Sequence, residues 1–229
     1  MTSNVIWRSA ELTDNSAYSS VLPVTIDGVR QYLFVTSAAV GGLNPADGSL
    51  FWKTDYPDVN LVACDPIYFN GIVFMSEGYK VGGYAWRVQK AKEGNGFSVE
   101  SAYKLRKVDN KHHGLLAVDN FLYSSTERGS FVCVDLSSGK IQWEERRMRG
   151  KASAVFADGK LILRKENTGE IILMDPNPKK YTEISRFKQP ERSSKNAWTY
   201  PLVVDKKLYL RDQDKIFCFD LADSGSAVH

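Results

Sequence analysis

The sequence has few of the residues that build disulfides, metal centres and membrane spans. Its 229 residues include three cysteines and three histidines. The cysteines form no CxxC or CxxxC pattern, which argues against structural zinc. No run of about 18 apolar residues is present, so we expect no transmembrane helix. The first residues are polar and lack the charged start and apolar stretch of an export signal, so we expect no signal peptide in this chain.

The chain also lacks a strong excess of one charge. Thirty Lys and Arg stand against 27 Asp and Glu, a net charge of +3. Two short basic clusters occur, at residues 146–149 and 179–180, and such clusters are typical of solvated loops. A nucleic-acid site needs a basic stripe with stacking aromatics, so we expect no nucleic-acid partner. Apolar content of 43% and charged content of 25% are ordinary for a soluble globular protein.

What is present is an internal repeat. Residues 44–52 read NPADGSLFW and residues 135–143 read DLSSGKIQW. Each copy begins with an Asp or Asn after an apolar run, continues through a turn containing glycine, and ends in a strand with tryptophan. The apolar–Asp step recurs at Asp175 and Asp220, and a copy with an insertion in place of the turn is expected near Arg87. Spacings of 40 and 45 residues, and one double spacing of 91, indicate a repeat architecture.

We call the position of the Asp or Asn in each copy its anchor. A second signal, a tight turn between two apolar runs, precedes each anchor. The five turns are Asp27-Gly28, Asn70-Gly71, Asp119-Asn120, Asp158-Gly159 and Asp205-Lys206. Most are of the Asp-Gly or Asn-Gly hairpin type, in which Gly or Asn accepts a positive φ. Each unit therefore reads strand, tight turn, strand, short loop, strand, Gly turn, strand. Four short antiparallel strands repeated every 40–50 residues or so are typical of a β-propeller. A β-sandwich, the alternative, would need the same ordered features by accident.

We predict an all-β fold, with a single β-propeller domain over residues 1–229 and five blades of four antiparallel strands. The predicted parts are units at about residues 20–57, 62–106, 112–150, 151–189 and 197–221, and an N-terminal closing strand at residues 4–10. The last unit has three strands, and the segment around Trp7 resembles the missing fourth. We therefore expect residues 5–8 to pair with residues 216–220 and close the ring, which removes two sheet edges. The alternative is a fragment of a larger ring, left open or completed by another chain.

Two pairs of residues share repeat positions and are expected to be structural. Cys133 and Cys218 sit at equivalent places in different units, so we expect both to be buried and unbridged. Arg164 and Arg211 each follow the core of a second strand. Repetition favours an arginine that braces the next loop or pairs with a neighbouring carboxylate, with anion binding as the alternative.

With the repeats in place, the chain resembles the pyrroloquinoline-quinone-like β-propeller repeat proteins, a group that includes outer-membrane assembly propellers similar to BamB. The resemblance covers nearly the whole chain and is carried by Asp135, Gly139, Lys140 and Trp143 and by the matching segment 44–52. Three further stretches resemble one bacterial subgroup, at residues 110–114, 190–198 and 208–214. That subgroup usually has additional blades and an export signal ahead of the point where this chain starts. The resemblance thus implies a periplasmic or exported protein, while the chain itself leaves compartment and blade number open.

The family name also implies a quinone cofactor. Quinoprotein dehydrogenases of this type have an adjacent cysteine pair, a calcium- or lanthanide-binding set of carboxylates and amides, and a catalytic aspartate. No two cysteines are adjacent here, and the other residues cannot be placed. We therefore expect no cofactor, and in particular no tight binding of pyrroloquinoline quinone.

The candidate site lies where the chain enters the innermost strand of each unit. Ring symmetry should bring these entry segments to one mouth of the central channel, where they offer a mixed polar and aromatic surface. The candidate ligand-binding residues are His112, His113, Trp198, Tyr200, Tyr18 and Asp65. The histidine pair admits three interpretations: a structural hydrogen bond, contact with a ligand, or a metal ligand or general base. The first is favoured, no metal is predicted, and Asp65 is the nearest further ligand by topology.

Two classes of function remain. The favoured one is a non-catalytic scaffold that binds a protein, peptide or glycan at the channel mouth, with a second chain as a further partner if the ring is a fragment. The alternative is an enzyme with a histidine-containing site at the mouth, dependent on a metal or a quinone. Catalysis would need convergent titratable groups beyond the histidine pair. The sequence reveals none, so no catalytic residue is predicted.

Overall fold

The computed structural model describes residues 4–56, 62–94 and 96–221, and its regular structure is almost entirely β-strand. Among the described residues the one helical segment is a single 3-10 turn, η1 (Arg146–Met148). No helix in these ranges is long and apolar enough to cross a membrane. The predicted all-β class is confirmed.

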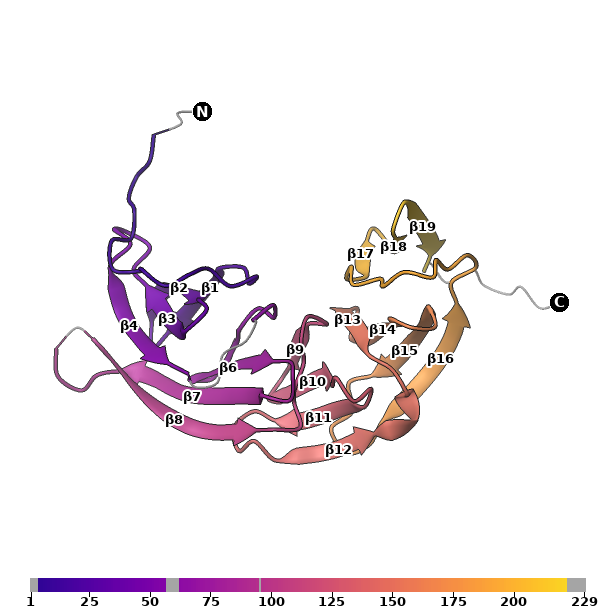
Figure 1. Ribbon diagram of the computed structural model, residues 1–229. Helices are drawn as coiled ribbons and strands as arrows, with labels where there is room; N and C mark the ends of the chain where they lie inside the picture. Colours follow the sequence, from indigo (N-terminus) through magenta and orange to yellow (C-terminus); the bar gives the residue numbers. More distant parts are fainter. Residues whose placement is uncertain (1–3, 57–61, 95, 222–229) are drawn as a thin grey trace.

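Five antiparallel sheets follow one another along the chain and form the blades of a β-propeller (Figure 1). Blade 1 contains β1 (Leu22–Ile26), β2 (Val29–Val35), β3 (Ala39–Leu43) and β4 (Leu50–Asp55). Blade 2 contains β5 (Ile67–Phe69), β6 (Ile72–Glu77), β7 (Gly82–Lys90) and β8 (Phe97–Leu105). Blade 3 contains β9 (Leu115–Val118), β10 (Phe121–Ser125), β11 (Phe131–Asp135) and β12 (Ile141–Glu145).

The last two blades continue the pattern, but blade 5 has three strands. Blade 4 contains β13 (Ala152–Ala157), β14 (Lys160–Lys165), β15 (Glu170–Asp175) and β16 (Thr182–Lys188). Blade 5 contains β17 (Leu202–Val204), β18 (Lys207–Asp212) and β19 (Lys215–Asp220). In every blade the strands pair in chain order. Each sheet falls within one of the five predicted units.

The local geometry follows from the turn chemistry that the sequence contains. In the turn from β1 to β2, Asp27 and Gly28 have φ of 47° and 79°. Such a pair of positive φ values gives a two-residue hairpin turn that matches the twist of the flanking strands. Asn70, Asp119, Asp158 and Asp205 likewise have positive φ at the equivalent turns.

A bulge between the third and fourth strands marks the same point in each complete blade. It follows Gly42, Ala85, Cys133 and Leu173. The Asp or Asn anchor comes two residues after the bulge in blades 1, 3 and 4. In blade 2 the same count leads to Arg87, which confirms the position expected for the copy that carries an insertion.

The apolar cores lie between neighbouring blades. Side chains alternate along a strand, so a sheet packed on both faces buries nearly every residue. In β6, Val73 and Met75 belong to the core shared with blade 1, whereas Ile72 and Phe74 belong to the core shared with blade 3. This two-sided burial explains why the middle strands read as continuous apolar runs.

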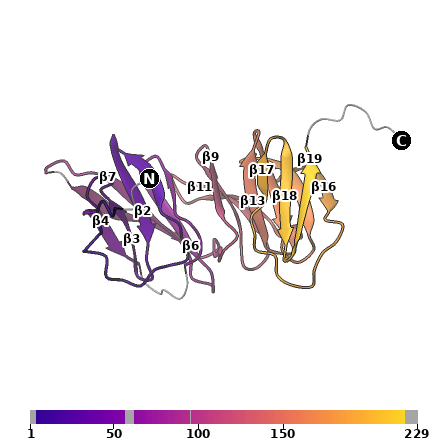
Figure 2. The ribbon, with the colours of Figure 1, turned by 90° about the horizontal axis from the view of Figure 1, so that it is seen from above.

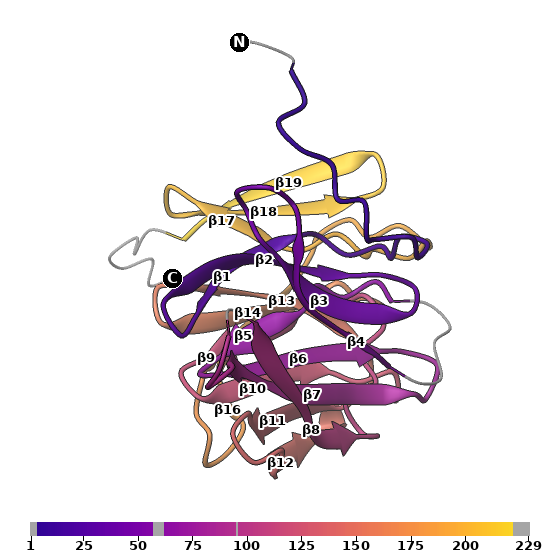
Figure 3. The same ribbon diagram turned by 90° about the vertical axis from the view of Figure 1, so that its left-hand side faces the viewer.

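The blades form an open arc, and the predicted closure by residues 4–10 is wrong. Blade 1 and blade 5 lie at opposite ends of the arc (Figures 1 and 2). Residues 4–10 form no strand, and Val5 and Ile6 are 82% and 91% exposed. Among the described residues, no fourth strand pairs with the free edge of β19. The N-terminal segment runs away from the sheets on the blade 1 side (Figure 3).

Trp7 shows why this segment resembles a fourth strand. Its indole donates a hydrogen bond to the carbonyl oxygen of Pro45 at 2.9 Å, and its ring covers Gly48 in the turn from β3 to β4. Tyr103 of β8 lies against Gly139 in the corresponding turn of blade 3. An aromatic residue on the outer strand of one blade thus packs on the glycine turn of the next blade. Trp7 makes the same kind of contact with the glycine turn of blade 1.

One cysteine departs from its predicted burial. Cys64 and Cys133 are buried, Cys218 is exposed, and all three are free. Cys218 pairs in register with Tyr209 on a face of blade 5 that also carries the exposed Leu202. No further blade covers this face among the described residues, so equivalence to Cys133 does not give equal burial.

Candidate functional site

The segments that enter the innermost strands of blades 3 and 5 meet at one rim of the arc. The hydroxyl of Tyr200, just before β17, donates a hydrogen bond to the carbonyl oxygen of His112, just before β9, at 3.1 Å. The ring of His112 lies edge-on to that of Trp198 with centroids 4.7 Å apart, and 4.1 Å from that of His113. Four predicted residues from blades 3 and 5 are thus in contact.

Glu166 is the centre of this cluster. It lies in the turn after β14, and its Oε2 is 3.0 Å from Nε2 of His113. The indole of Trp198 donates a hydrogen bond to Oε1 at 2.7 Å. The ammonium of Lys151 lies 3.8 Å from Oε2. One carboxylate therefore joins side chains from blades 3, 4 and 5.

The electrostatics keep the histidines neutral and the carboxylate ionised. Burial, followed by the neighbouring His113, lowers the pKa of His112 to about 4. Burial also lowers the pKa of His113, and the bond to Glu166 does not reverse this. Burial raises the pKa of Glu166, but the hydrogen bonds from Trp198 and His113 outweigh it and hold the pKa below its usual range. At neutral pH the cluster thus contains two imidazoles and one carboxylate.

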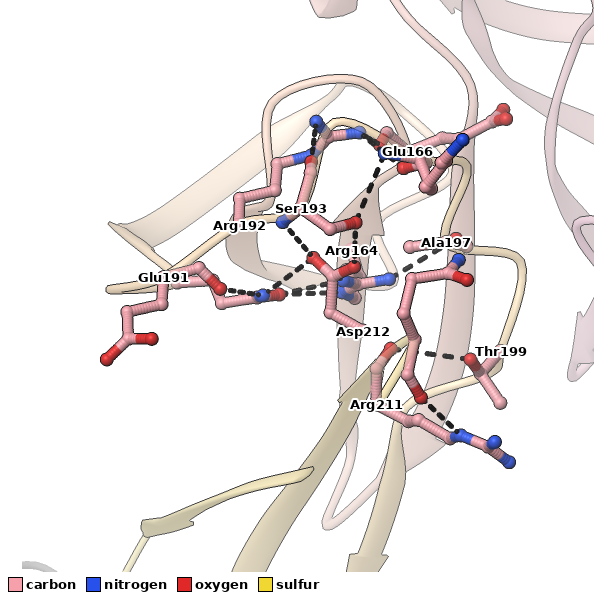
Figure 4. Close-up of polar contacts among 12 residues, drawn as sticks. Arg164, Glu166, Glu191, Arg192, Ser193, Ala197, Thr199, Arg211 and Asp212 are labelled. Atoms are coloured by element: carbon pink, nitrogen blue, oxygen red, sulfur yellow. Dashed lines mark hydrogen bonds and ion pairs between the residues drawn. The ribbon is translucent and has the colours of Figure 1, made fainter. Parts of the chain in front are cut away.

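A buried polar network positions the segment that carries Trp198 (Figure 4). Arg164 of β14 donates to the side chain of Gln189 at 2.7 Å and to the carbonyl oxygen of Ala197 at 3.2 Å. It also lies 3.5 Å from the carboxylate of Asp212 in β18. Of the two structural roles predicted for Arg164, pairing with a neighbouring carboxylate is confirmed. The segment that it braces is the connection from β16 to β17, not the next loop along the chain.

The same network continues to the backbone of Glu166. Asp212 accepts hydrogen bonds from the hydroxyl of Ser193 at 2.5 Å and from its amide at 3.1 Å. The guanidinium of Arg192, the residue before Ser193, donates to the carbonyl oxygen of Glu166 at 2.6 Å (Figure 4). Arg211 lies outside this network: it is exposed, and its Nε donates to the carbonyl oxygen of Gln213 in the next turn, which is one of the two structural contacts predicted for it. The connection from β16 to β17 is therefore bonded to β18 through Ser193 and to the turn after β14 through Arg192.

Tyr18 and Asp65 lie on the other side of the inner surface. Asp65 accepts hydrogen bonds from the amide of Ser20 and the hydroxyl of Ser19, next to the exposed Tyr18. Asp65 and Tyr200 both line a cavity of about 490 Å³ on the inner side of the arc. Its other lining residues come from first strands and their entries: Leu22, Pro66, Ile67, Tyr68, Gly114, Leu115, Leu116, Ala117, Ala154, Val155 and Pro201. The cavity is largely apolar.

Sequence reasoning missed Glu166 and Arg192, whereas Lys151 lies in the entry segment of blade 4, which was expected at the channel mouth. Topology pointed to Asp65 as the nearest carboxylate, but the one that reaches the histidines is Glu166. A signal existed, because the loop after a second strand and the loop before a first strand lie at the same end of a blade. From this topology, the turn after β14, which contains Glu166, could have been predicted to lie at the rim.

The rim residues could hold a small cation, whereas the thiols do not suit the quinone. One ring nitrogen from each histidine and one oxygen of Glu166 all lie within 4.8 Å of one another. The three cysteines lie in blades 2, 3 and 5 or their entry segments, so they offer no adjacent pair. The residues present do not fit the quinone site of the dehydrogenases.

Comparison with known proteins places the chain in a family. A family model described as "Outer membrane protein assembly factor BamB" matches residues 2–145, more than half of the chain. The chain belongs to this BamB family. No curated protein sequence matches it significantly.

Solved structures share the BamB-like fold at low sequence identity. Crystalline BamB from Moraxella catarrhalis superposes with a TM-score of 0.61 at 13% identity, over 90% of this chain and 59% of that one. The computationally designed protein Ika8 gives a TM-score of 0.60 at 10% identity, over 88% of this chain and 58% of that one. This chain therefore spans somewhat less than three-fifths of either structure. The predicted resemblance to the pyrroloquinoline-quinone-like β-propeller repeat proteins that are similar to BamB is confirmed.

Proposed function

We propose that this chain is a non-catalytic scaffold that binds an extended protein segment along the inner surface of the arc. The observation that carries the proposal is an apolar cavity with the exposed Tyr200 in its wall, with two further exposed aromatics, Trp198 and Tyr18, on the entry segments of blades 5 and 1. Tyr18, Trp198 and Tyr200 are 77%, 51% and 46% exposed. Rings with one apolar face and one polar end are suited to peptide and glycan contacts.

The cavity favours a peptide over a glycan. Its walls include aliphatic and proline side chains such as Ile67, Leu116 and Pro201, with Asp65 as the charged group. A glycan would need more hydrogen-bonding side chains than these walls provide. The family description as an assembly factor fits a role in binding proteins.

An enzyme is a weaker interpretation of the same rim. Among the described rim residues, Glu166 is already bonded to His113 and Trp198 and lies close to Lys151. A general base needs access to the proton that it abstracts. The geometry therefore favours binding over catalysis.

The test is selection of peptides against the folded chain. Random 12-residue peptides displayed on phage would be selected on the wild type, and the winners measured against Trp198→Ala, Tyr200→Ala and Ile184→Ala. Ile184 is exposed on the outer strand β16, so Ile184→Ala is the control. We expect loss of affinity of about tenfold or more for the rim variants, since aromatic anchors dominate such contacts.

Two outcomes would contradict the proposal. One is a set of peptides that bind all variants equally, which would place the contact elsewhere. The other is the absence of peptide binding together with rim-dependent binding of oligosaccharides on a glycan array. That result would keep the rim and replace the ligand class.

A further inference from the structure

We propose that His112, His113 and Glu166 form a site for one divalent transition metal ion of the zinc class. The site is independent of the peptide-binding proposal, and it adds a ligand that the fold and the family do not require. Its three ligand atoms come from two loops that different blades bring to the rim.

The first argument is geometric. Zinc binds imidazole nitrogen at about 2.0–2.1 Å and carboxylate oxygen at about 2.0–2.2 Å, so two ligands of one ion lie at most about 4.3 Å apart. The atoms here lie within 4.8 Å of one another, and Nε2 of His113 is already 3.0 Å from Oε2 of Glu166. Side-chain shifts of less than about 1 Å would complete the site.

The second argument is an unsatisfied atom. Nε2 of His112 is buried and has no hydrogen-bond partner among the described residues. A buried polar nitrogen without a hydrogen-bond partner has a free-energy cost. A metal ion bound by this nitrogen removes that cost, and nothing else described at the rim does so.

The third argument is ligand chemistry. Each histidine offers one ring nitrogen and Glu166 offers one carboxylate oxygen. Two nitrogens and one carboxylate suit zinc, cobalt, nickel or copper. Calcium and magnesium prefer sites built from oxygen alone. The proposed class is therefore a borderline transition metal.

The groups around the three ligands have the arrangement that a metal site needs. Trp198 donates to Oε1 of Glu166, which leaves Oε2 directed toward the histidines. The side chain of Asn110 accepts from the amide of His113 and donates to the carbonyl oxygen of Gly114, so it fixes the loop. Such outer contacts orient ligands and contribute to affinity.

Lys151 is the competing cation. Its ammonium lies 3.8 Å from Oε2 of Glu166, and its side chain is 30% exposed. A bound metal ion would repel this ammonium toward solvent. Removing the charge at residue 151 should therefore strengthen metal binding, whereas a merely structural histidine pair predicts no such effect.

The experiment is a metal titration of the full chain, produced without a polyhistidine tag and stripped with a chelator. Cobalt(II) absorption reports coordination, and competition with a chromophoric chelator gives the zinc affinity. We expect one ion per chain in the wild type. His112→Ala, His113→Ala and Glu166→Gln should each weaken zinc binding at least about tenfold, and Lys151→Gln should strengthen it several-fold.

The control uses the third histidine. His229→Ala should leave the affinity unchanged; residue 229 is outside the described ranges. Circular dichroism of each apo variant checks folding, so a misfolded variant is replaced by His112→Gln or His113→Gln. Wild-type affinity weaker than millimolar, or zinc binding that survives both histidine substitutions, would overturn the proposal. Neither result bears on peptide binding.

Discussion

Arg164 and Asp212 lie on different blades and meet in the protein interior, with Nη2 of the guanidinium 3.5 Å from Oδ2 of the carboxylate. Their side chains are 1% and 0% exposed. Gln189 joins them, because its side-chain oxygen accepts from Arg164 and its nitrogen donates to Asp212. The pair thus connects blades 4 and 5 and the segment that carries Trp198.

Replacing Arg164 should strongly destabilise the fold. Arg164→Met leaves the Asp212 carboxylate buried without its countercharge, and breaking a buried pair in this way costs about 3–5 kcal/mol. Arg211→Ala is the matched control, because Arg211 has the same repeat position but is exposed, and a surface change costs about 0.5 kcal/mol or less. Urea unfolding of both variants measures the difference. Similar losses for the two would contradict the assigned roles.

Asp212 should make the free energy of unfolding decrease at low pH. Burial raises its pKa, but the hydrogen bonds from Ser193 and Gln189 and the charge of Arg164 outweigh this and hold the pKa below its usual range. A depressed folded pKa gives stability that is present above the unfolded value, about 3.9, and is lost as pH falls through the folded value. The difference in unfolding free energy between wild type and Asp212→Asn should therefore shrink below about pH 4. Urea unfolding across pH 3–7 or so tests this, and a constant difference would argue against it.

The contact between Trp7 and Gly48 can be tested with a pair of glycines. Gly48 and Gly28 have φ of 74° and 79°, so alanine is strained at both. At Gly28 the added methyl meets open space, whereas at Gly48 it meets the ring of Trp7. We expect Gly48→Ala to cost about 1–2 kcal/mol more than Gly28→Ala and to speed tryptic cleavage after Arg8. Equal stability and equal cleavage would mean that Trp7 is not held on this turn.

The three thiols should differ in reactivity. Burial raises the pKa of Cys64 to about 12 and that of Cys133 to about 11, whereas Cys218 is exposed. The thiolate is the reactive form. One thiol should therefore react promptly with a disulfide reagent in the native protein, and three after denaturation. Cys218→Ser should remove the fast phase, and a fast phase that persists would contradict the assigned exposure.

The sequence predicted the features that repeat locally. A turn such as Asp27-Gly28 reports its own backbone geometry, because few residues accept two positive φ values. The position of Arg87 followed from counting, since the bulge after Ala85 repeats in register. The meeting of His112 with Trp198 and Tyr200 followed from strand order, which sends every entry segment to the same end of its blade.

Other features depend on contacts that no local pattern contains. Trp7 belongs to a fourth-strand motif, but pairing with β19 depends on the curvature of the whole arc. Cys218 repeats the position of Cys133, yet its burial requires a neighbouring blade on that face. Glu166 was missed because its importance comes from three side chains that reach it from distant segments. In each case the local pattern was correct and the long-range partner was not encoded in it.

The placement of the cores between blades has a consequence for how the chain unfolds. Each inner sheet is stabilised through two neighbours and each end sheet through one, so cooperativity passes along the arc from one interface to the next. Among the described residues, the core between blades 4 and 5 has four buried apolar residues, Ile162, Ile171, Leu208 and Leu210, whereas that between blades 1 and 2 has twelve. Local opening should therefore begin at β17–β19, and amide exchange should slow progressively toward the opposite end. The rim, whose Trp198 and Tyr200 precede β17, lies next to the part of the molecule that opens first.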